Sequence, residues 1–597
     1  MSTYTGVGSG VDQLDRYTEN SMRNTINAYT TYELNLMKDH NMKFMLGMNR
    51  VTYDMEYSQA RRKQVNDVEN PQFNFATGEQ YVWGDKDWNA QLGYFGRFNY
   101  DYAGRYLLEA NLRYDGTSVF GADQRWRWYP SFSAGWRVSE EAFMQSIKEA
   151  VSALKLRASW GKIGDQSVPN SLYVSTISSG STVSWIGGDG NLLNYVGTPT
   201  SVARDITWQD ISTFDIGLDA RFLNGELGFT FDWFRRKTEN MIVPNQDLTF
   251  TYGTSSLKGN YGNLHTDGWE IGLDYSHQFK NGLRITANAT LSDFKTIIDN
   301  YGNVTGLDSN YKGKRYGDIW GYKVERLYQK DDFVYDADGN FVKEKVTTGK
   351  GAGVEINKLK DPNAHNQAYL QSGSLVFGPG DVMYKDLDGD GEITSGSNTI
   401  DDHGDKVVIG NSTPRYQYSF RVGADWKGFD LSLFFQGVGK CDMWGSSSLT
   451  LAGFNTGDGA IAKRFSTDYW REDRTDAFYP RAVNMGNGTN SFNMCYSDRY
   501  LLNMAYLRLK NITVGYTLPQ YLTKKALIQK AHIYASCENL FTWDHLDGTP
   551  VDPEAAVLKT ADYEYLTNSS TSNYAGGRVG IGTPAFRTIS IGVQLTF

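Results

Sequence analysis

The chain ends with "AFRTISIGVQLTF", residues 585 to 597, in which apolar and polar side chains alternate strictly. The apolar set is Ile589, Ile591, Val593, Leu595 and Phe597, with small or polar residues between its members. Because successive side chains of a β-strand point to opposite faces, this stretch predicts a strand with one apolar and one polar face. Such a strand covers the core of a soluble sandwich or faces lipid from a membrane barrel. The function therefore depends on what the apolar face contacts.

The same alternation recurs along the chain in pairs of segments joined by short turns. The clearest pairs are 214–222 with 227–233, 269–275 with 283–291, and 416–426 with 431–435. Weaker pairs lie near 24–36 with 42–54, 89–101 with 105–115, 126–138 with 152–162, and 501–517 with 531–543. Asn224-Gly225 is a strong hairpin-turn dipeptide. Counting the last strand gives about fifteen strands, each near or slightly above the 9–11 residues that a tilted membrane strand needs.

The connections between these segments are of two kinds. Most turns within pairs are short, and two of them, 139–151 and 518–530, have room for a short helix. The connections between pairs are long at 55–88, 163–207 and 295–414, well beyond ordinary loop lengths. Outer-membrane barrels have short periplasmic turns and longer extracellular loops, whereas a soluble sandwich has no reason to place its long loops at one end.

Charged residues on the polar strand faces fit an aqueous lumen. They are Asp215, Asp219, Arg221, Glu270, Asp274, Arg284, Arg421 and Asp425. We therefore predict an all-β protein, a transmembrane antiparallel β-barrel with Phe597 as its C-terminal signature. Because the last strand completes no pair, the strand number is odd, although bacterial single-chain barrels have even numbers. The chain is thus expected to be the C-terminal part of a larger barrel, which agrees with a start, "MSTYTGVGSGVDQ", that has no signal-peptide pattern.

Composition excludes several other classes of protein. No apolar run approaches the roughly 20 residues of a membrane-crossing helix. The net charge of -9 argues against a nucleic-acid binder, which needs a basic face. The chain has no HExxH, G-x-S-x-G or Walker A pattern, so no enzyme is predicted. The three cysteines form no CxxC pair, and whether Cys441 and Cys495 pair when oxidised stays open.

Five stretches resemble the SusC/RagA type of TonB-dependent transporter, and they occur in that family's order. They are "LEANLRYDGTSVFGADQRWRWYPSFSAGWRVSEEAFM" (108–144), "LKLRASWGKIGDQSVPNSLY" (154–173), "GDVMYKDLDGDGEIT" (380–394), "YLRLKNITVGYTLP" (506–519) and "YASCENLFTW" (534–543).

The resemblance implies a 22-stranded barrel with a plugged lumen in the outer membrane of a Gram-negative bacterium, in contact with lipid and lipopolysaccharide. It implies import of a glycan, or in some members a peptide, with a SusD-like surface lipoprotein and energy from TonB-ExbB-ExbD. Residues 1–597 would then be the C-terminal barrel part, with 295–414 as a long extracellular loop region. The signal peptide, the plug and the first strands would be missing, so transport by this part alone is not expected. The alternatives are a plug-less porin or adhesin barrel and a soluble glycan-binding β protein.

The motif "DLDGDGEI" (386–393) carries candidate metal ligands. Asp386, Asp388, Asp390 and the Glu392 carbonyl match the first half of an EF-hand loop, in which hard oxygens bind Ca²⁺. Position twelve of an EF-hand loop is usually a glutamate, and here it is a serine. Asp401, Asp402 or Asp405 would have to supply this ligand from farther along the chain. The motif predicts either a Ca²⁺ or Mg²⁺ site or a solvated turn.

Aromatic residues in the loops are candidates for stacking on sugar rings or on a partner. They are Trp185, Trp320, Tyr322, Trp444, Tyr469 and Trp470. In a chain that is 14% aromatic, packing within loops or an interfacial girdle explains most such residues equally well.

Overall fold

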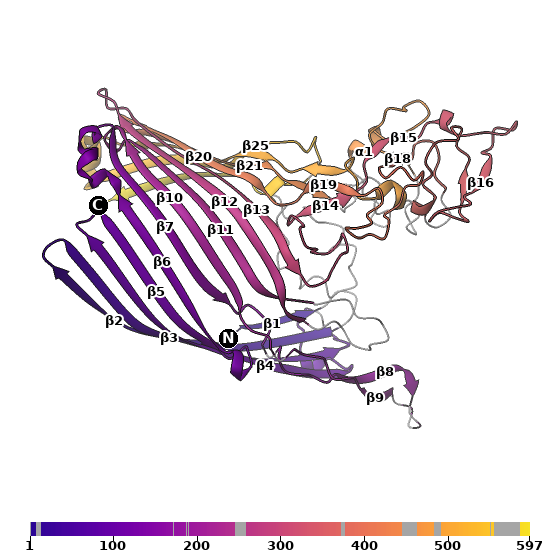
Figure 1. The fold of residues 1–597 in the computed structure, drawn as a ribbon, viewed down its shortest axis with the longest axis horizontal. Coiled ribbons are helices and arrows are strands. Elements are labelled where there is room, and N and C mark those ends of the chain that lie inside the picture. The colour runs from indigo at the N-terminus through magenta and orange to yellow at the C-terminus, as the bar shows by residue number, and fades with distance from the viewer. Residues whose placement is uncertain are drawn as a thin grey trace.

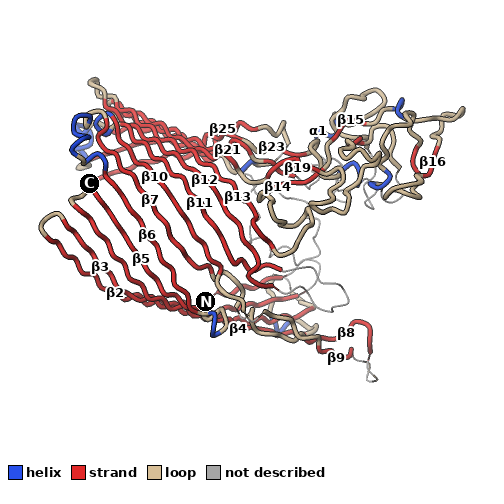
Figure 2. The backbone as a smooth tube through the Cα atoms, in the orientation of Figure 1, coloured by secondary structure: helices blue, strands red, loops and turns tan. Residues whose placement is uncertain are grey.

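The computed structural model describes the following residues: 2–7, 13–67, 69–170, 172–186, 188, 190, 192–203, 205–244, 258–371, 376–444, 463–482, 491–549, 551–554 and 585–597. Strands dominate these ranges, and helices are confined to short segments in the connections (Figure 2).

One antiparallel sheet of 16 strands organises the molecule, and each strand pairs with its neighbours in the order of the chain (Figure 1). Its strands are β1 (Ser2–Val7), β2 (Gln13–Leu36), β3 (His40–Lys63), β4 (Gln80–Tyr102), β5 (Tyr106–Thr117), β6 (Trp126–Arg137), β7 (Val151–Asp165), β10 (Gln209–Phe222), β11 (Leu227–Pro244), β12 (Lys258–Gln278), β13 (Arg284–Tyr301), β20 (Arg415–Trp426), β21 (Phe429–Lys440), β24 (Tyr506–Thr517), β25 (Lys530–Asp544) and β26 (Thr588–Thr596). The sheet curves strongly, as Figure 1 shows. The fifteen predicted strands are confirmed, but the short strand β1, which the sequence pattern did not reveal, brings the described sheet to sixteen, so the predicted odd strand number is wrong.

Short turns and long connections lie at opposite ends of the sheet (Figure 1). At the short end, Lys427 and Gly428 both have positive φ (49° and 91°), as a two-residue hairpin turn requires. The two turns with room for a helix contain the 3₁₀-helix η4 (Ala142–Ile147) and the helix α2 (Gln520–Thr523). The predicted alternation of short turns and long loops is therefore confirmed.

The predicted loop at 55–88 is wrong, because β3 and β4 pair without interruption up to Arg62 and Gln80. Backbone pairing forms this extension, and its cross-strand side-chain pairs are polar, with 2.9 Å between Lys63 Nζ and Glu79 Oε2 and 3.3 Å between Lys86 Nζ and Glu56 Oε2. Because these strand ends lack a strict alternation of apolar and polar side chains, the sequence pattern did not indicate strands there. The other two loops differ less: β7 ends at Asp165 and β13 continues to Tyr301.

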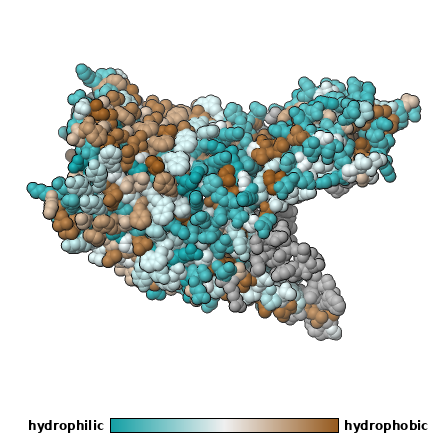
Figure 3. All heavy atoms as spheres, in the orientation of Figure 1, coloured by the Kyte–Doolittle hydropathy of each residue, from teal (hydrophilic) through white to brown (hydrophobic). Residues whose placement is uncertain are grey.

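The apolar face of the last strand is uncovered. Ile589, Ile591, Val593 and Leu595 are 74, 80, 61 and 44% exposed, and Phe597 after β26 is 77% exposed. No second sheet or helix of the described residues packs over this face. Figure 3 shows hydrophobic residues gathered over the strands on the side of the short turns, and a mostly hydrophilic loop region. An uncovered apolar strand face of this kind is typical of contact with lipid.

The opposite face of the sheet carries ionic networks. Arg157 on β7 contacts Asp219 (Nε to Oδ2, 3.0 Å) and Asp232 (Nη1 to Oδ1, 2.7 Å) across the neighbouring strands. Gly217 lies beneath this guanidinium, because a Cβ there would lie 2.5 Å from Arg157 Cζ. Arg221 and Asp274 pair at 3.0 Å on the same face. Of the charged residues predicted for the lumen, Asp219, Arg221 and Asp274 thus form ion pairs on this face.

Among the described residues, no helix has the length and apolar character needed to cross a membrane.

The long connections contain most of the large buried side chains. Their strand pairs are β8 (Ser179–Ile186) with β9 (Leu192–Val196), β14 (Asp318–Gly321) with β19 (Val407–Asn411), β15 (Val324–Leu327) with β18 (Val382–Tyr384), β16 (Lys343–Lys345) with β17 (Glu355–Asn357), and β22 (Asp442–Trp444) with β23 (Leu501–Asn503). One core contains Tyr328, Phe333 and Phe377, and a second contains Tyr322, Tyr384 and Trp470.

A buried ionic contact joins two of these connections. Asp381 is fully buried and accepts hydrogen bonds from Arg481 Nε (2.8 Å) and Nη2 (2.9 Å) and from Asn493 Nδ2 (2.8 Å). Residues 302–414 and 441–505 therefore form one unit in the described parts, which we name the loop unit.

Candidate functional site

The DxDxDG turn of the loop unit brings three carboxylates together. Oxygens of Asp386, Asp388 and Asp405 all lie within 4.8 Å of one another. Asp405 is fully buried, and its two oxygens accept the backbone N–H groups of Leu387 and Thr394, each at 2.7 Å. Burial raises the pKa of Asp405, and the nearby Asp388 and Asp386 add to that increase, although the two N–H groups oppose it. Three hard oxygens in this arrangement suit a Ca²⁺ ion.

The Asp390 carboxylate, a predicted ligand, lies outside this group of three, and the Glu392 carbonyl stays a prediction. Asp390 accepts the backbone N–H of Glu392 at 2.8 Å, and the Glu392 carboxylate accepts the N–H of Lys350 at 2.9 Å. Asp386 also closes the turn by accepting the N–H of Gly391 at 2.9 Å. Asp405, one of the three late substitutes considered from the sequence, is the residue that the fold brings to the motif.

The predicted aromatic ligands are mostly packed inside the loop unit. Tyr322, Trp444 and Trp470 are only 3, 8 and 9% exposed. The Trp470 indole donates to Gln329 Oε1 at 3.3 Å, and Trp444 stacks on Tyr496 at 4.6 Å between ring centroids. This environment favours a packing role for the three rings.

The remaining aromatic candidates are scattered. Trp320 on β14 is half-buried and donates to the Tyr311 hydroxyl at 2.9 Å. Tyr469 is half-buried and packs near Phe465 at 5.5 Å. Trp185 lies on β8, and its side chain is outside the described residues. The structure brings Tyr322 and Trp470 into one cluster and does not gather the whole set into one site.

Cys441 and Cys495 pack in different hydrophobic clusters and form no disulfide. Burial raises the pKa of each thiol to about 11. Both thiols therefore stay protonated at neutral pH, which makes them poor nucleophiles and metal ligands.

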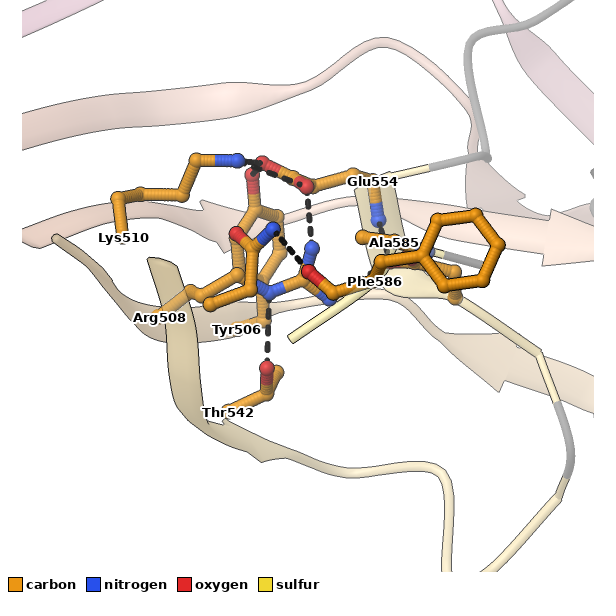
Figure 4. Close-up of polar contacts among 9 residues, drawn as sticks. Tyr506, Arg508, Lys510, Thr542, Glu554, Ala585 and Phe586 are labelled. Carbon is orange, nitrogen blue, oxygen red and sulfur yellow. Dashed lines mark hydrogen bonds and ion pairs between the residues drawn. The ribbon is translucent and has the colours of Figure 1, made fainter. Parts of the chain in front are cut away.

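A second polar site, which sequence reasoning missed, lies at the loop end of β24. Arg508 is 4% exposed and donates through Nε to Thr542 Oγ1 (2.8 Å) and through Nη2 to Asp552 Oδ1 (2.7 Å). Its Nη1 contacts Glu554, which also accepts from Lys510 Nζ at 2.9 Å. Figure 4 shows Arg508 and Lys510 converging on Glu554 from one strand. We name the described residues 545–549 and 551–554 the strap, since this contact ties them to the sheet.

Both arms of the connection after β25 are held at this site. Asp552 Oδ2 accepts the backbone N–H of Ala585 at 3.3 Å, and Asn539 donates to the Phe586 carbonyl at 3.0 Å. Arg508 and Lys510 lie two residues apart on β24, so both side chains leave the same face of the strand and reach the Glu554 carboxylate. Burial alone would raise the pKa of Asp552, but hydrogen bonds from Arg508 and the Glu554 N–H keep it below its ordinary value.

Comparison with known proteins identifies the family. The family model described as "TonB dependent receptor-like, beta-barrel" matches residues 2–540. TonB-dependent receptor P3 of Formosa agariphila is 26% identical over 607 residues, which cover 99% of this chain and 54% of that protein. TonB-dependent receptor SusC of Bacteroides thetaiotaomicron is 26% identical over 480 residues, which cover 78% of this chain and 41% of SusC.

Solved structures agree in fold. The RagAB peptide importer in its "open-open" state superposes with a TM-score of 0.71 at 17% identity, covering 98% of this chain and 56% of the importer chain. The chain spans about half the length of the curated relatives it matches. Its sheet, its uncovered apolar face and these matches show that the chain belongs to the TonB dependent receptor-like β-barrel family of outer-membrane proteins.

Proposed function

We propose that the protein imports a nutrient oligomer across the outer membrane, as the barrel wall of a SusC-like, TonB-dependent transporter. The observation that carries this proposal is the curved sheet itself, which is apolar on one face and ionic on the other and has a folded loop unit at one end only. The ionic face would line an aqueous passage, and no bond of the substrate is broken.

The parts of this function that lie beyond the chain follow from its relatives. Because the chain spans about half the length of TonB-dependent receptor P3, we propose that coupling to TonB-ExbB-ExbD requires residues of the longer protein. A SusD-like lipoprotein would sit on the loop unit. A glycan is the substrate we favour, as the resemblance of the sequence to the SusC type implies, and an oligopeptide is the alternative, because the RagAB neighbour is a peptide importer.

Deletion and uptake tests separate the candidate functions. A strain lacking the full-length gene should lose growth on one oligosaccharide and keep growth on its monosaccharide. Loss of growth on oligopeptides instead would move the substrate to the peptide class. Uptake that survives deletion of tonB would contradict the energy coupling and favour a plug-less porin.

We further propose that Asp386, Asp388 and Asp405 bind Ca²⁺. Calorimetric titration of the full-length protein with CaCl₂ should show one site that the Asp388→Asn variant lacks. Asp390→Asn is the matched control, because its carboxylate lies outside the group of three. If the wild-type protein takes up no Ca²⁺, or if Asp390→Asn alone abolishes binding, the assignment is wrong.

A further inference from the structure

A small hollow lies beside the strap on the ionic face of the sheet. Its volume is about 220 Å³, and its lining includes Gln417, Gln436, Met504, Tyr506, Pro553 and Glu554. Drug-sized ligands occupy pockets of about 300–1,000 Å³, so this hollow has room for a single ring rather than a whole oligomer.

Strand register places the polar groups of the hollow on one face. Gln436 on β21 lies opposite Arg508 on β24, and Val438 lies opposite both Tyr506 and Gln417. Directly opposed residues of paired strands point to the same side of a sheet. The two glutamines therefore share the face on which Arg508 holds the strap.

The two glutamine amides are uncommitted. Within the part of the chain that the structure describes, neither the Gln417 nor the Gln436 side chain makes a hydrogen bond, whereas the neighbouring Arg508 and Lys510 are engaged. Each amide offers a carbonyl acceptor and two N–H donors. Together they present both donors and acceptors to anything that enters the hollow.

The carboxylate of the hollow is already neutralised. Glu554 contacts the Arg508 guanidinium and accepts from Lys510 Nζ at 2.9 Å, so it adds acceptor oxygens without a free negative charge. The same contacts fix Pro553 and Glu554 before any ligand arrives, which lowers the entropy cost of binding. Val438, which is half-buried, supplies apolar surface beside these polar groups.

Building on the proposed import of a glycan, we infer that this hollow is a subsite for one uncharged sugar ring of the substrate. Adjacent hydroxyls of a sugar match the planar amide and carboxylate groups, while its C–H face packs against Val438. A peptide backbone is disfavoured, because β20, β21 and β24 are each paired on both sides and offer no free strand edge.

The test is calorimetric binding to the full-length protein in detergent. The probes are neutral six-residue oligosaccharides (maltohexaose, cellohexaose, xylohexaose and mannohexaose) and an uncharged hexapeptide of alanine and serine. For the oligosaccharide that binds, the double variant Gln417→Leu and Gln436→Leu should weaken the affinity about 10- to 100-fold, since two hydrogen bonds are lost. Gln594→Leu on β26 is the matched control, as a glutamine of a paired strand outside the hollow, and should bind like the wild type.

The outcomes separate the subsite from the transport proposal. Wild-type oligosaccharide affinity in a folded double variant, verified by its heat-modifiable migration in gels, would overturn the subsite and leave glycan import standing. Binding of the hexapeptide but of no oligosaccharide would overturn the glycan substrate, and the sugar subsite with it.

Discussion

Replacement of Asp381 by alanine tests the contact that joins the two halves of the loop unit. The carboxylate is fully buried and receives two hydrogen bonds from Arg481, one from Asn493 and one from the Gly378 N–H (2.7 Å). Its removal leaves a guanidinium and two further donors without their acceptor. Breaking a buried ion pair in this way costs about 3–5 kcal/mol. Because the Arg481 side chain is 29% exposed and water can reach it, the lower end, about 3 kcal/mol, applies.

Hydrogen exchange of the β18 amides (Val382–Tyr384) measures this cost, because these amides are buried beside the contact. A loss of about 3 kcal/mol corresponds to roughly 100-fold faster exchange where local opening controls the rate. Asp473→Ala is the control, since its pair with Arg471 is exposed and such pairs contribute about 0–1 kcal/mol. The double variant Asp381→Leu with Arg481→Leu should recover part of the loss, because no unpaired guanidinium remains, while the Asn493 and Gly378 donors still lack their acceptor. Exchange in Asp381→Ala within threefold of the wild type would refute the reasoning.

Three further predictions concern the strap and the sheet. Arg508→Met should free the strap at a cost of about 3 kcal/mol in stability and raise the mobility of a spin label at position 549. Lys510→Met should cost only about 1 kcal/mol, because the Lys510 side chain is 25% exposed. Equal effects of the two substitutions would contradict this ranking. The pKa of Asp552 in the folded protein is lowered, so its contribution to strap stability is complete above the ordinary aspartate pKa of about 3.9 and is lost as the pH falls through the lower folded value. The spin label at position 549 should therefore become mobile only below about pH 4. Release of the strap near pH 6 would contradict the assignment. Ile216→Arg should destabilise the folded barrel in lipid by about 2–4 kcal/mol, because this exposed residue lies on the apolar face. Urea unfolding from lipid vesicles measures the change. An effect below about 0.5 kcal/mol would argue against lipid contact at this position.

The sheet could be predicted from the sequence because its signal is local. Alternation in segments such as 585–597, together with turns such as Lys427-Gly428, fixes strands without knowledge of distant residues. The ends of β3 and β4 beyond the apolar region could not be predicted, because their cross-strand pairs Lys63–Glu79 and Lys86–Glu56 are polar. Strands that are solvated on both faces carry no alternation to detect.

The sites were harder to predict because they depend on contacts between distant residues. The motif at 386–393 is visible, but nothing local distinguishes Asp405 from Asp401 or Asp402 as the third carboxylate. The Arg508 site joins residues 44 and 46 positions apart, and only the fold shows which carboxylates meet that cation. The one sequence signal for this site is a matched spacing: two cations at 508 and 510, and two acids at 552 and 554. Tyr322 and Trp470 looked like ligand platforms, and the fold uses them as core.

The contact made by the apolar strand faces is measured most directly by spin labels placed one at a time along residues 588–596 of the full-length protein in lipid vesicles. Collision with oxygen should be high, and with a water-soluble nickel complex low, at positions 589, 591, 593 and 595, with the opposite pattern at the positions between them. High nickel accessibility at the odd positions, or low accessibility to both reagents there, would place that face in water or in a protein core and contradict the membrane barrel.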